Sequence, residues 1–167
     1  MPRKSTNPNK SQYQICREEC GLSREAASEQ LNMSDSRLEK LENGQTRITP
    51  QDVVDMAKAY KQPKLCNYYC ANDCEIGQKS VPELKAKGLT EIVLSMLNSL
   101  NQLNQEKDRL IQIAADNEIT SDELPDFVTI KKHLAEISIT ADTLQLWIDD
   151  RIADGSIKKE DYDSLNA

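Results

Sequence analysis

The stretch that decides the fold is Leu22–Gly44, LSREAASEQLNMSDSRLEKLENG. It predicts two short helices, residues 23–31 and 35–42, with a turn at Asn32, because Asn tolerates a left-handed backbone better than most residues. Ser34 can cap the second helix, and Asn43-Gly44 can end it. The apolar residues expected to pack inward are Ala27, Leu31, Met33, Leu38 and Leu41. The side chains then left on the outer face include Arg24, Asp35, Ser36, Arg37 and Lys40.

Short helices are also predicted on both sides of this stretch. One runs from Ser11 to Gly21, a residue typical of helix ends. Another follows Thr49, with Pro50 at its first helical position and a carboxylate in its first turn. The apolar face of this last helix is expected to be Val53, Val54, Met56, Ala57 and Tyr60. Residues 11–65 are therefore predicted to form a domain of four or five helices.

The stretch from Leu22 to Gly44 resembles, without a gap, the lambda-repressor-like (Xre-type) family of helix-turn-helix transcriptional regulators. The likeness extends loosely over residues 11–61, and its most specific part is Leu38–Gly44, LEKLENG. Further matches lie at Arg17, Gly21, Leu22 and Ser23. The resemblance implies a DNA-binding domain. Helix-forming residues such as Leu, Glu, Gln, Ala and Lys dominate the whole chain, which predicts an all-α protein. No catalytic constellation is evident in the sequence, so we expect no enzyme activity.

The resemblance also implies which side chains meet DNA. Arg24 stands where the second helix binds phosphate, and residues 34–36 stand where the recognition helix contacts base edges. Lys40 faces the same groove, and residues 43–47 form the loop that meets the DNA backbone. The complete candidate set is Arg24, Ser34, Asp35, Ser36, Arg37, Lys40, Asn43, Gln45 and Arg47.

Some positions depart from the family pattern. Asn32 replaces the usual turn glycine, and Ala27 and Ser28 replace a leucine and a tightly packed alanine. Asp35 matters most, because a carboxylate in the groove repels phosphates. It can accept a hydrogen bond from a cytosine amino group, or it can stabilise the helix start without touching a base.

Charge is distributed unevenly along the chain, whose net charge is −7. Residues 1–65 carry a net charge of +2 and residues 66–167 a net charge of −9. Any DNA-facing part is therefore expected in the N-terminal half, and its non-specific attraction to DNA is weak. We expect a homodimer on two half-sites about one helical turn apart.

Residues 89–153 are predicted to form a long antiparallel helical hairpin, similar to a coiled coil, for dimerisation or signal reception. Thr120 and Glu123 fit a capping box at the start of the second helix. Each helix of the hairpin carries a row of apolar residues along one face, which we call its seam. The two seams are expected to pack against each other or against a second copy of the chain. Their members alternate at spacings of four and three: Leu89, Val93, Met96, Leu100, Leu103, Leu110 and Ala114, then Phe127, Ile130, Leu134, Ile137, Ala141, Leu144 and Ile148.

Cysteines gather in residues 66–88. This segment is the connector expected between the N-terminal helical domain of residues 11–65, which we call the head, and the hairpin. Cys66, Cys70 and Cys74 are spaced by four, and three thiolates can hold Zn²⁺ or an iron–sulfur cluster. The usual C-x₂-C pair is absent, however, and Cys16 and Cys66 also fit as small core residues. Core packing is the favoured interpretation, and no cofactor is expected.

The remaining segments carry little chemistry. Residues 1–10 are expected to form a disordered basic arm, and residues 154–167 a tail with a short helix. No signal peptide or membrane-spanning stretch is evident, so we expect a cytoplasmic protein. The lone His133 is placed on the face opposite the seam, and no catalytic constellation surrounds it.

Two functions remain open at this stage. The first is a sequence-specific, non-enzymatic transcriptional regulator that binds duplex DNA as a dimer. The alternative is an adaptor that keeps the helix-turn-helix fold without binding DNA, contacts protein through its acidic hairpin, and senses metal or redox state through its cysteines.

Overall fold

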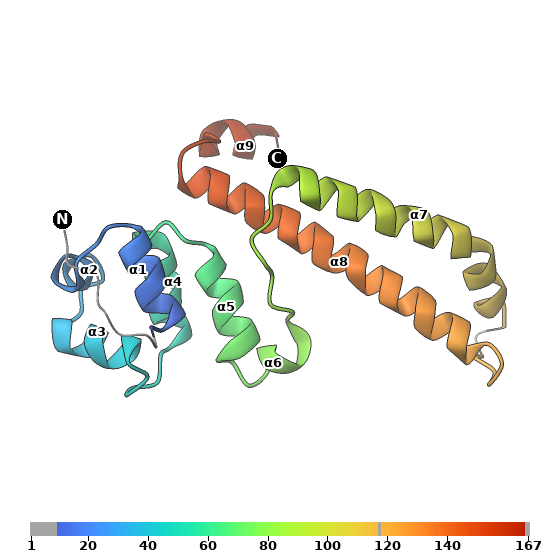
Figure 1. The fold of residues 1–167 in the computed structure, drawn as a ribbon, viewed down its shortest axis with the longest axis horizontal. Helices are drawn as coiled ribbons and strands as arrows, with labels where there is room; N and C mark the ends of the chain where they lie inside the picture. The colour runs from blue at the N-terminus through green and yellow to red at the C-terminus, as the bar shows by residue number, and fades with distance from the viewer. Residues whose placement is uncertain (1–9, 117, 166–167) are drawn as a thin grey trace. The chain divides into compact units, whose positions relative to one another are not determined.

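The computed structural model describes residues 10–116 and 118–165, which are helical with no strand among them (Figure 1). The predicted basic arm, apart from Lys10, lies outside the described residues. The chain divides into two compact units. One comprises Met1–Glu83 together with Ile148–Ala167, and the other comprises Leu84–Trp147.

The first unit contains the predicted head. Its helices are α1 (Gln12–Glu19), α2 (Arg24–Gln30), α3 (Asp35–Glu42), α4 (Pro50–Ala59), α5 (Lys64–Asn72) and α6 (Gly77–Ser80). The C-terminal helix α9 (Lys159–Leu165) belongs to the same unit, in the predicted tail.

Polar caps fix where the first four helices begin. In each, a Ser or Thr hydroxyl accepts a hydrogen bond from the backbone N–H three residues further on, which satisfies a donor that the helix leaves open. These caps are Ser11, Ser23, Ser34 and Thr49. The turns after α1, α2 and α3 contain the left-handed residues Gly21, Asn32 and Gly44, at φ +71°, +49° and +67°. The predicted starts and turns of these helices are confirmed.

The head is built around a single apolar core. Cys16, Ala27, Leu38 and Met56 are fully buried there, one from each of the first four helices. Val54, which we expected on the apolar face of α4, is instead 36% exposed. Val53, Met56, Ala57 and Tyr60 fill that face, and Val54 lies outside the arc that they cover.

Helix α5 overlaps the segment that was expected to form a connector, residues 66–88. The segment from Lys64 to Asn72 is helical, and its Leu65 and Tyr69 are buried in the head core. The Tyr13 hydroxyl of α1 donates a hydrogen bond of 2.5 Å to Asp73, just after α5. The boundary expected at residue 65 therefore falls inside a fifth helix of the head.

The second unit is dominated by two long helices, α7 (Leu89–Ile113) and the part of α8 (Leu124–Ala153) that ends at Trp147, which run side by side (Figure 1). His133 Nδ1 of α8 and the Glu106 carboxylate of α7 are hydrogen-bonded at 2.7 Å, and Arg109 Nε of α7 donates to Asp126 of α8 at 2.8 Å. His133 is thus half-buried between the helices, not on the opposite face as predicted. The polar partner on α7 explains why it is tolerated there.

The contact face of α7 is rotated from the predicted seam. Met96, Leu103 and Leu110 are partly buried as expected. The alternate positions, however, are filled by Ile92, Ser99, Glu106 and Ile113. Three of them lie one residue before an expected member, and Glu106 lies one residue before Lys107, where the predicted pattern is broken. Several predicted seam residues are exposed as a result: Leu89, Val93, Leu100, Ala114, Leu134 and Ala141.

The predicted capping box before α8 is only half present. The Thr120 backbone N–H donates to the Glu123 carboxylate at 3.1 Å, but the Thr120 hydroxyl also donates to it instead of accepting. The helix consequently begins at Leu124, after a further turn.

Candidate nucleic-acid interface

The candidate interface is the exposed side of α2, α3 and the loop after α3. Helix α2 ends in backbone hydrogen bonds from Leu31, Asn32 and Met33 to carbonyls of α2, which close a tight turn. The fully buried Ala27 and Leu38 lie in the core beneath the two helices. The turn and this packing fix the angle at which α3 is presented.

A buried ion pair anchors α3 to α1. Arg17 Nε and Nη2 donate to the two carboxylate oxygens of Glu42 at 2.6 and 3.0 Å, and both side chains are almost completely buried. Arg17 Nη1 also donates to the Leu22 carbonyl at 2.8 Å. Burial alone would lower the pKa of Arg17, but the hydrogen bonds and charge of Glu42 outweigh it and raise the pKa.

Arg24 joins this network, although the family resemblance implied that it binds phosphate. Its Nη1 donates to Glu39 at 3.0 Å and its Nε to Glu42 at 3.4 Å. The side chain is only 30% exposed. Arg24 therefore connects α2 to α3 in the absence of DNA.

Arg37 is likewise engaged, with α4. Its Nη2 donates to Asp52 at 2.7 Å, and the other oxygen of Asp52 accepts from the Thr49 backbone and hydroxyl in a capping box. The Arg37 side chain is still about half exposed, so it lies at the edge of the interface. Arg37 connects α3 to the start of α4.

The remaining predicted residues are all exposed: Ser34, Asp35, Ser36, Lys40, Asn43, Gln45 and Arg47. The Ser34 hydroxyl caps α3, so the Asp35 carboxylate is not needed as the cap. Within the described residues, Lys40 and Arg47 form no ion pair, unlike Arg24 and Arg37. They are the cations of this set most available to an anionic ligand.

The sequence prediction missed the ion-pair network itself. Glu42 lies one turn after Leu38 and next to Leu41, on the buried face of α3. A carboxylate at a core-facing position needs a buried cation, and Arg17 was already noted as part of the family match. The pairing could therefore have been suspected from the helical spacing.

The cysteines pack against the head core. Cys16 is fully buried, as predicted, and Cys66, Cys70 and Cys74 are partly buried beside it. Burial raises the pKa of Cys16 and of Cys66. In the described part of the chain, no three His, Cys, Asp or Glu side chains are grouped so as to hold a metal. The structure therefore does not bring the three candidate ligands together.

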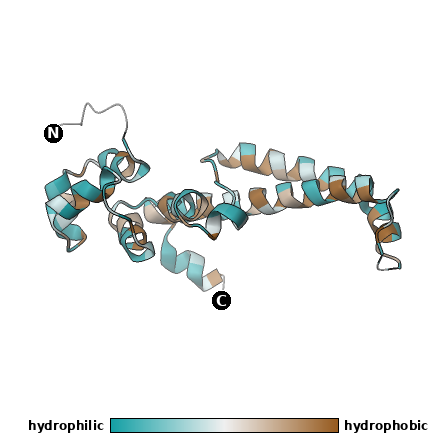
Figure 2. Ribbon diagram, turned by 90° about the horizontal axis from the view of Figure 1, so that it is seen from below, coloured by the Kyte–Doolittle hydropathy of each residue, from teal (hydrophilic) through white to brown (hydrophobic). Residues whose placement is uncertain are grey.

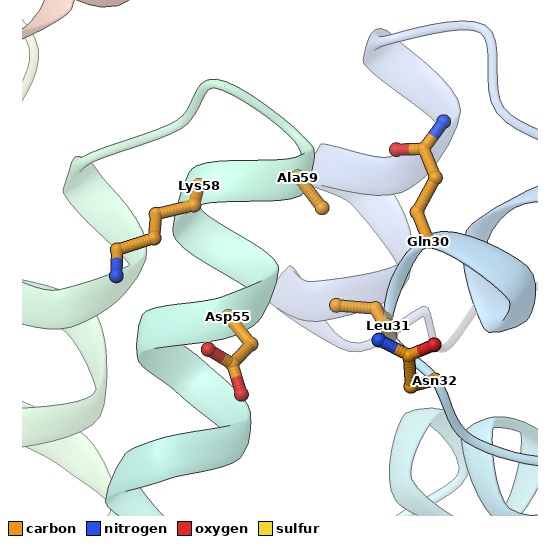
Figure 3. A pocket seen from close by; sticks show the side chains of 6 residues that line it. All are labelled: Gln30, Leu31, Asn32, Asp55, Lys58 and Ala59. Carbon is orange, nitrogen blue, oxygen red and sulfur yellow. The ribbon is translucent and has the colours of Figure 1, made fainter.

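A groove of about 440 Å³ lies elsewhere on the head, between the end of α2 and α4 (Figure 3). Its lining is Gln30, Leu31, Asn32, Asp55, Lys58 and Ala59, none of them in the predicted DNA-binding set. Asp55 and Lys58 offer opposite charges from adjacent turns of α4. The groove is open and mixed in polarity, and it is separate from the candidate interface.

Comparison with known proteins supports the class that the geometry indicates. Residues 14–65 match a family model described as a helix-turn-helix domain. This segment is therefore a helix-turn-helix domain, consistent with an Xre-like regulator as the sequence resemblance predicted. No curated protein and no solved structure matches the chain. None of the described helices is both long and apolar enough to cross a membrane.

Proposed function

We propose that the protein is a sequence-specific transcriptional regulator that binds operator DNA as a homodimer in the cytoplasm and catalyses no reaction. The main support for this proposal is that α3 is held rigidly on the head while its outer side is exposed. The helix is held from behind by Arg17, Arg24 and Arg37, while its capped N-terminus and Lys40 face outward. A rigid, exposed, polar helix on a helix-turn-helix scaffold suits entry into the major groove.

The candidate residues take two kinds of role. Residues 34–36 and Lys40 contact base edges, and the loop residues Asn43, Gln45 and Arg47 contact the DNA backbone. Arg24 and Arg37 position α3, since their guanidinium groups already bind carboxylates. Their contribution to phosphate binding is correspondingly smaller than the family resemblance implied.

Asp35 is proposed to act as a hydrogen-bond acceptor in the groove. It is exposed in the first turn of α3, where the helix dipole stabilises its charge, and Ser34 supplies the cap. A carboxylate in this position suits the amino group of cytosine. The Asp35→Asn variant would then bind a changed set of sequences.

Dimerisation is part of the proposal because the candidate interface has no excess of positive charge. Residues 24–47 contain four basic and five acidic side chains, so one head neutralises few phosphates. Two heads on adjacent half-sites double the number of contacts.

A Lys40→Ala substitution tests the DNA-binding role. Duplexes from the region upstream of the protein's own gene, and duplexes selected from random sequence, would be titrated by mobility shift. We expect Lys40→Ala to weaken binding by about tenfold or more, which corresponds to one groove contact of about 1.4 kcal/mol. Lys58→Ala, which removes an exposed lysine from α4, is the control and should bind normally. Equal affinity of wild type and Lys40→Ala on every duplex would refute the assignment.

The adaptor function is kept as a second candidate because of the carboxylates at the interface. Glu39 lies exposed on α3 between the predicted contact residues, and it reduces the attraction of this face for DNA. An adaptor would show no steep loss of duplex affinity with salt, whereas a DNA-binding protein would.

A further inference from the structure

The two helices of the hairpin leave one side of their pair apolar. In heptad notation, the a positions of α7 (Met96, Leu103, Leu110) and its d positions (Ile92, Ser99, Glu106, Ile113) are buried or partly buried, and Glu106 pairs with His133 of α8. On α8 the corresponding residues are Ile130, His133, Ile137 and Thr140. In an antiparallel pair packed in this way, the e positions of both helices flank the same side, and the g positions flank the other.

The e side carries large apolar residues that the hairpin itself does not bury. Val93 and Leu100 of α7 are 42% and 44% exposed, and Leu134 of α8 is 44% exposed. The neighbouring b positions of α7 add Leu97 and Ile111, at 53% and 61%. We call these five residues the outer apolar face. Figure 2 shows hydrophobic residues recurring along the length of both helices.

The g side is polar by contrast. Its residues are Ser95, Gln102 and Arg109 on α7, and Thr129, Glu136 and Thr143 on α8. The asymmetry matters because a helix that is apolar at a, d and e fits a bundle in which a further helix covers the e side.

The outer apolar face also lacks the negative charge that marks the rest of this half of the chain. Residues 66–167 carry a net charge of −9, yet no Asp or Glu occupies an e or b position between Thr90 and Ile111 of α7 or between Leu124 and Gln145 of α8. The charged residues at these positions are Lys107 and Lys131. Two acidic hairpins would repel each other through most surfaces, but they can approach through this one.

The face is hollowed where a side chain from another helix would insert. A groove of about 300 Å³ lies along α7, lined by Leu100, Leu103, Asn104, Lys107 and Leu110. The exposed leucine and isoleucine side chains beside it are of the kind that fill such holes when helices pack together. One surface thus offers both projecting apolar residues and a recess, as a self-complementary interface requires.

We propose that the outer apolar face binds the same face of a second copy, so that two hairpins form a four-helix bundle. Helix α7 has 25 residues and is about 37 Å long, so the contact can extend over several heptads. The partner is a copy of this chain because the face is apolar, recessed and free of carboxylates. The purpose of the bundle, to supply two DNA-binding heads, rests on the proposed function.

The test is the mass of the full-length chain in solution without DNA, measured by sedimentation equilibrium at tens of micromolar. We expect wild type at twice the chain mass of 18.9 kDa. Leu100→Glu should raise the dissociation constant of the dimer by at least about a hundredfold, because it buries an unpaired charge. Gln105→Glu adds the same charge at an exposed c position on the far side of α7, and it should remain dimeric.

Circular dichroism would establish that Leu100→Glu is folded, and Leu97→Glu offers a more exposed second site if it is not. A monomeric wild type, or dimers of wild-type stability in both leucine variants, would overturn the proposal. DNA binding is measured separately. A chain that is monomeric alone but binds operator DNA as a dimer contradicts this interface alone, and a dimer that binds no DNA contradicts the proposed function alone.

Discussion

At the scale of single residues, the candidate interface depends on the buried carboxylate of Glu42. The Glu42 carboxylate is fully buried and accepts hydrogen bonds from Arg17 and Arg24, on two other segments of the head. Removing one member of a buried pair leaves the other charge desolvated and without compensation. Glu42 therefore governs the position of α3 although it cannot touch DNA.

Substituting Glu42 is expected to destabilise the head strongly. Glu42→Gln should cost about 3 kcal/mol or more, which makes amide hydrogen exchange in α1 and α3 more than about a hundredfold faster. Exchange would be followed by mass spectrometry on the full chain. Glu39→Gln is the matched control, because the Glu39 side chain is half exposed and its ion pair is worth less than about 1 kcal/mol. Similar exchange rates in the two variants would argue against the buried network.

Thiol reactivity gives a second prediction at this scale. Burial raises the pKa of Cys16 and Cys66, so at pH 8 each carries less thiolate than an ordinary cysteine and gains reactivity only as the pH rises further. With iodoacetamide, the exposed Cys20 should be alkylated first and Cys16 last, as followed by peptide mass spectrometry. In urea the order should disappear. If zinc protected Cys66, Cys70 and Cys74 selectively, the metal-site hypothesis would replace core packing.

At the scale of helices and turns, local signals in the sequence predicted the head well. Serine and threonine caps, and the left-handed residues after each helix, set the limits of α1 to α4 through bonds within a few residues. Helix α5 escaped prediction because it has no side-chain cap, and the burial of Leu65 and Tyr69 by distant segments stabilises it.

The hairpin seam was only half predictable for a different reason. The e positions of α7 are as apolar as its d positions, so both sets fit the same spacing. The d positions include Glu106, which pairs with His133 across the hairpin. A sequence pattern cannot reveal that two polar residues will satisfy each other at a contact face.

The turn between α2 and α3 provides a prediction at this scale. Asn32 has φ +49°, a conformation that costs a residue with a β-carbon about 1–2 kcal/mol and that Asn and Gly tolerate best. Asn32→Ala should lower the stability of the head by about 1 kcal/mol, whereas Asn32→Gly should leave it nearly unchanged. Urea unfolding followed by circular dichroism measures the difference. A stable Asn32→Ala variant would mean that the turn relaxes to another conformation.

At the scale of the whole molecule, the change of charge along the chain does not follow the division into units, because Leu84–Trp147 carries a net charge of −4 and the other unit a net charge of −3. The head holds the helix-turn-helix domain and a small positive net charge, while the negative charge lies mostly beyond residue 65. The exposed side chains of the candidate interface were predictable from the family resemblance and helical spacing. The ion pairs of Arg24 and Arg37 were not, because their partners are brought near by the fold.

The most direct test of the central claim is the salt dependence of duplex binding by the full chain. Fluorescence anisotropy on a selected duplex would be recorded between about 50 and 200 mM salt, where a DNA-binding protein loses affinity in proportion to the phosphates that it neutralises. We predict a steep loss for wild type and a shallower slope, by about one, for Arg47→Ala, which removes an unpaired cation from the interface. Binding that is absent, or that does not change with salt, would contradict the assignment of the protein as a DNA-binding regulator.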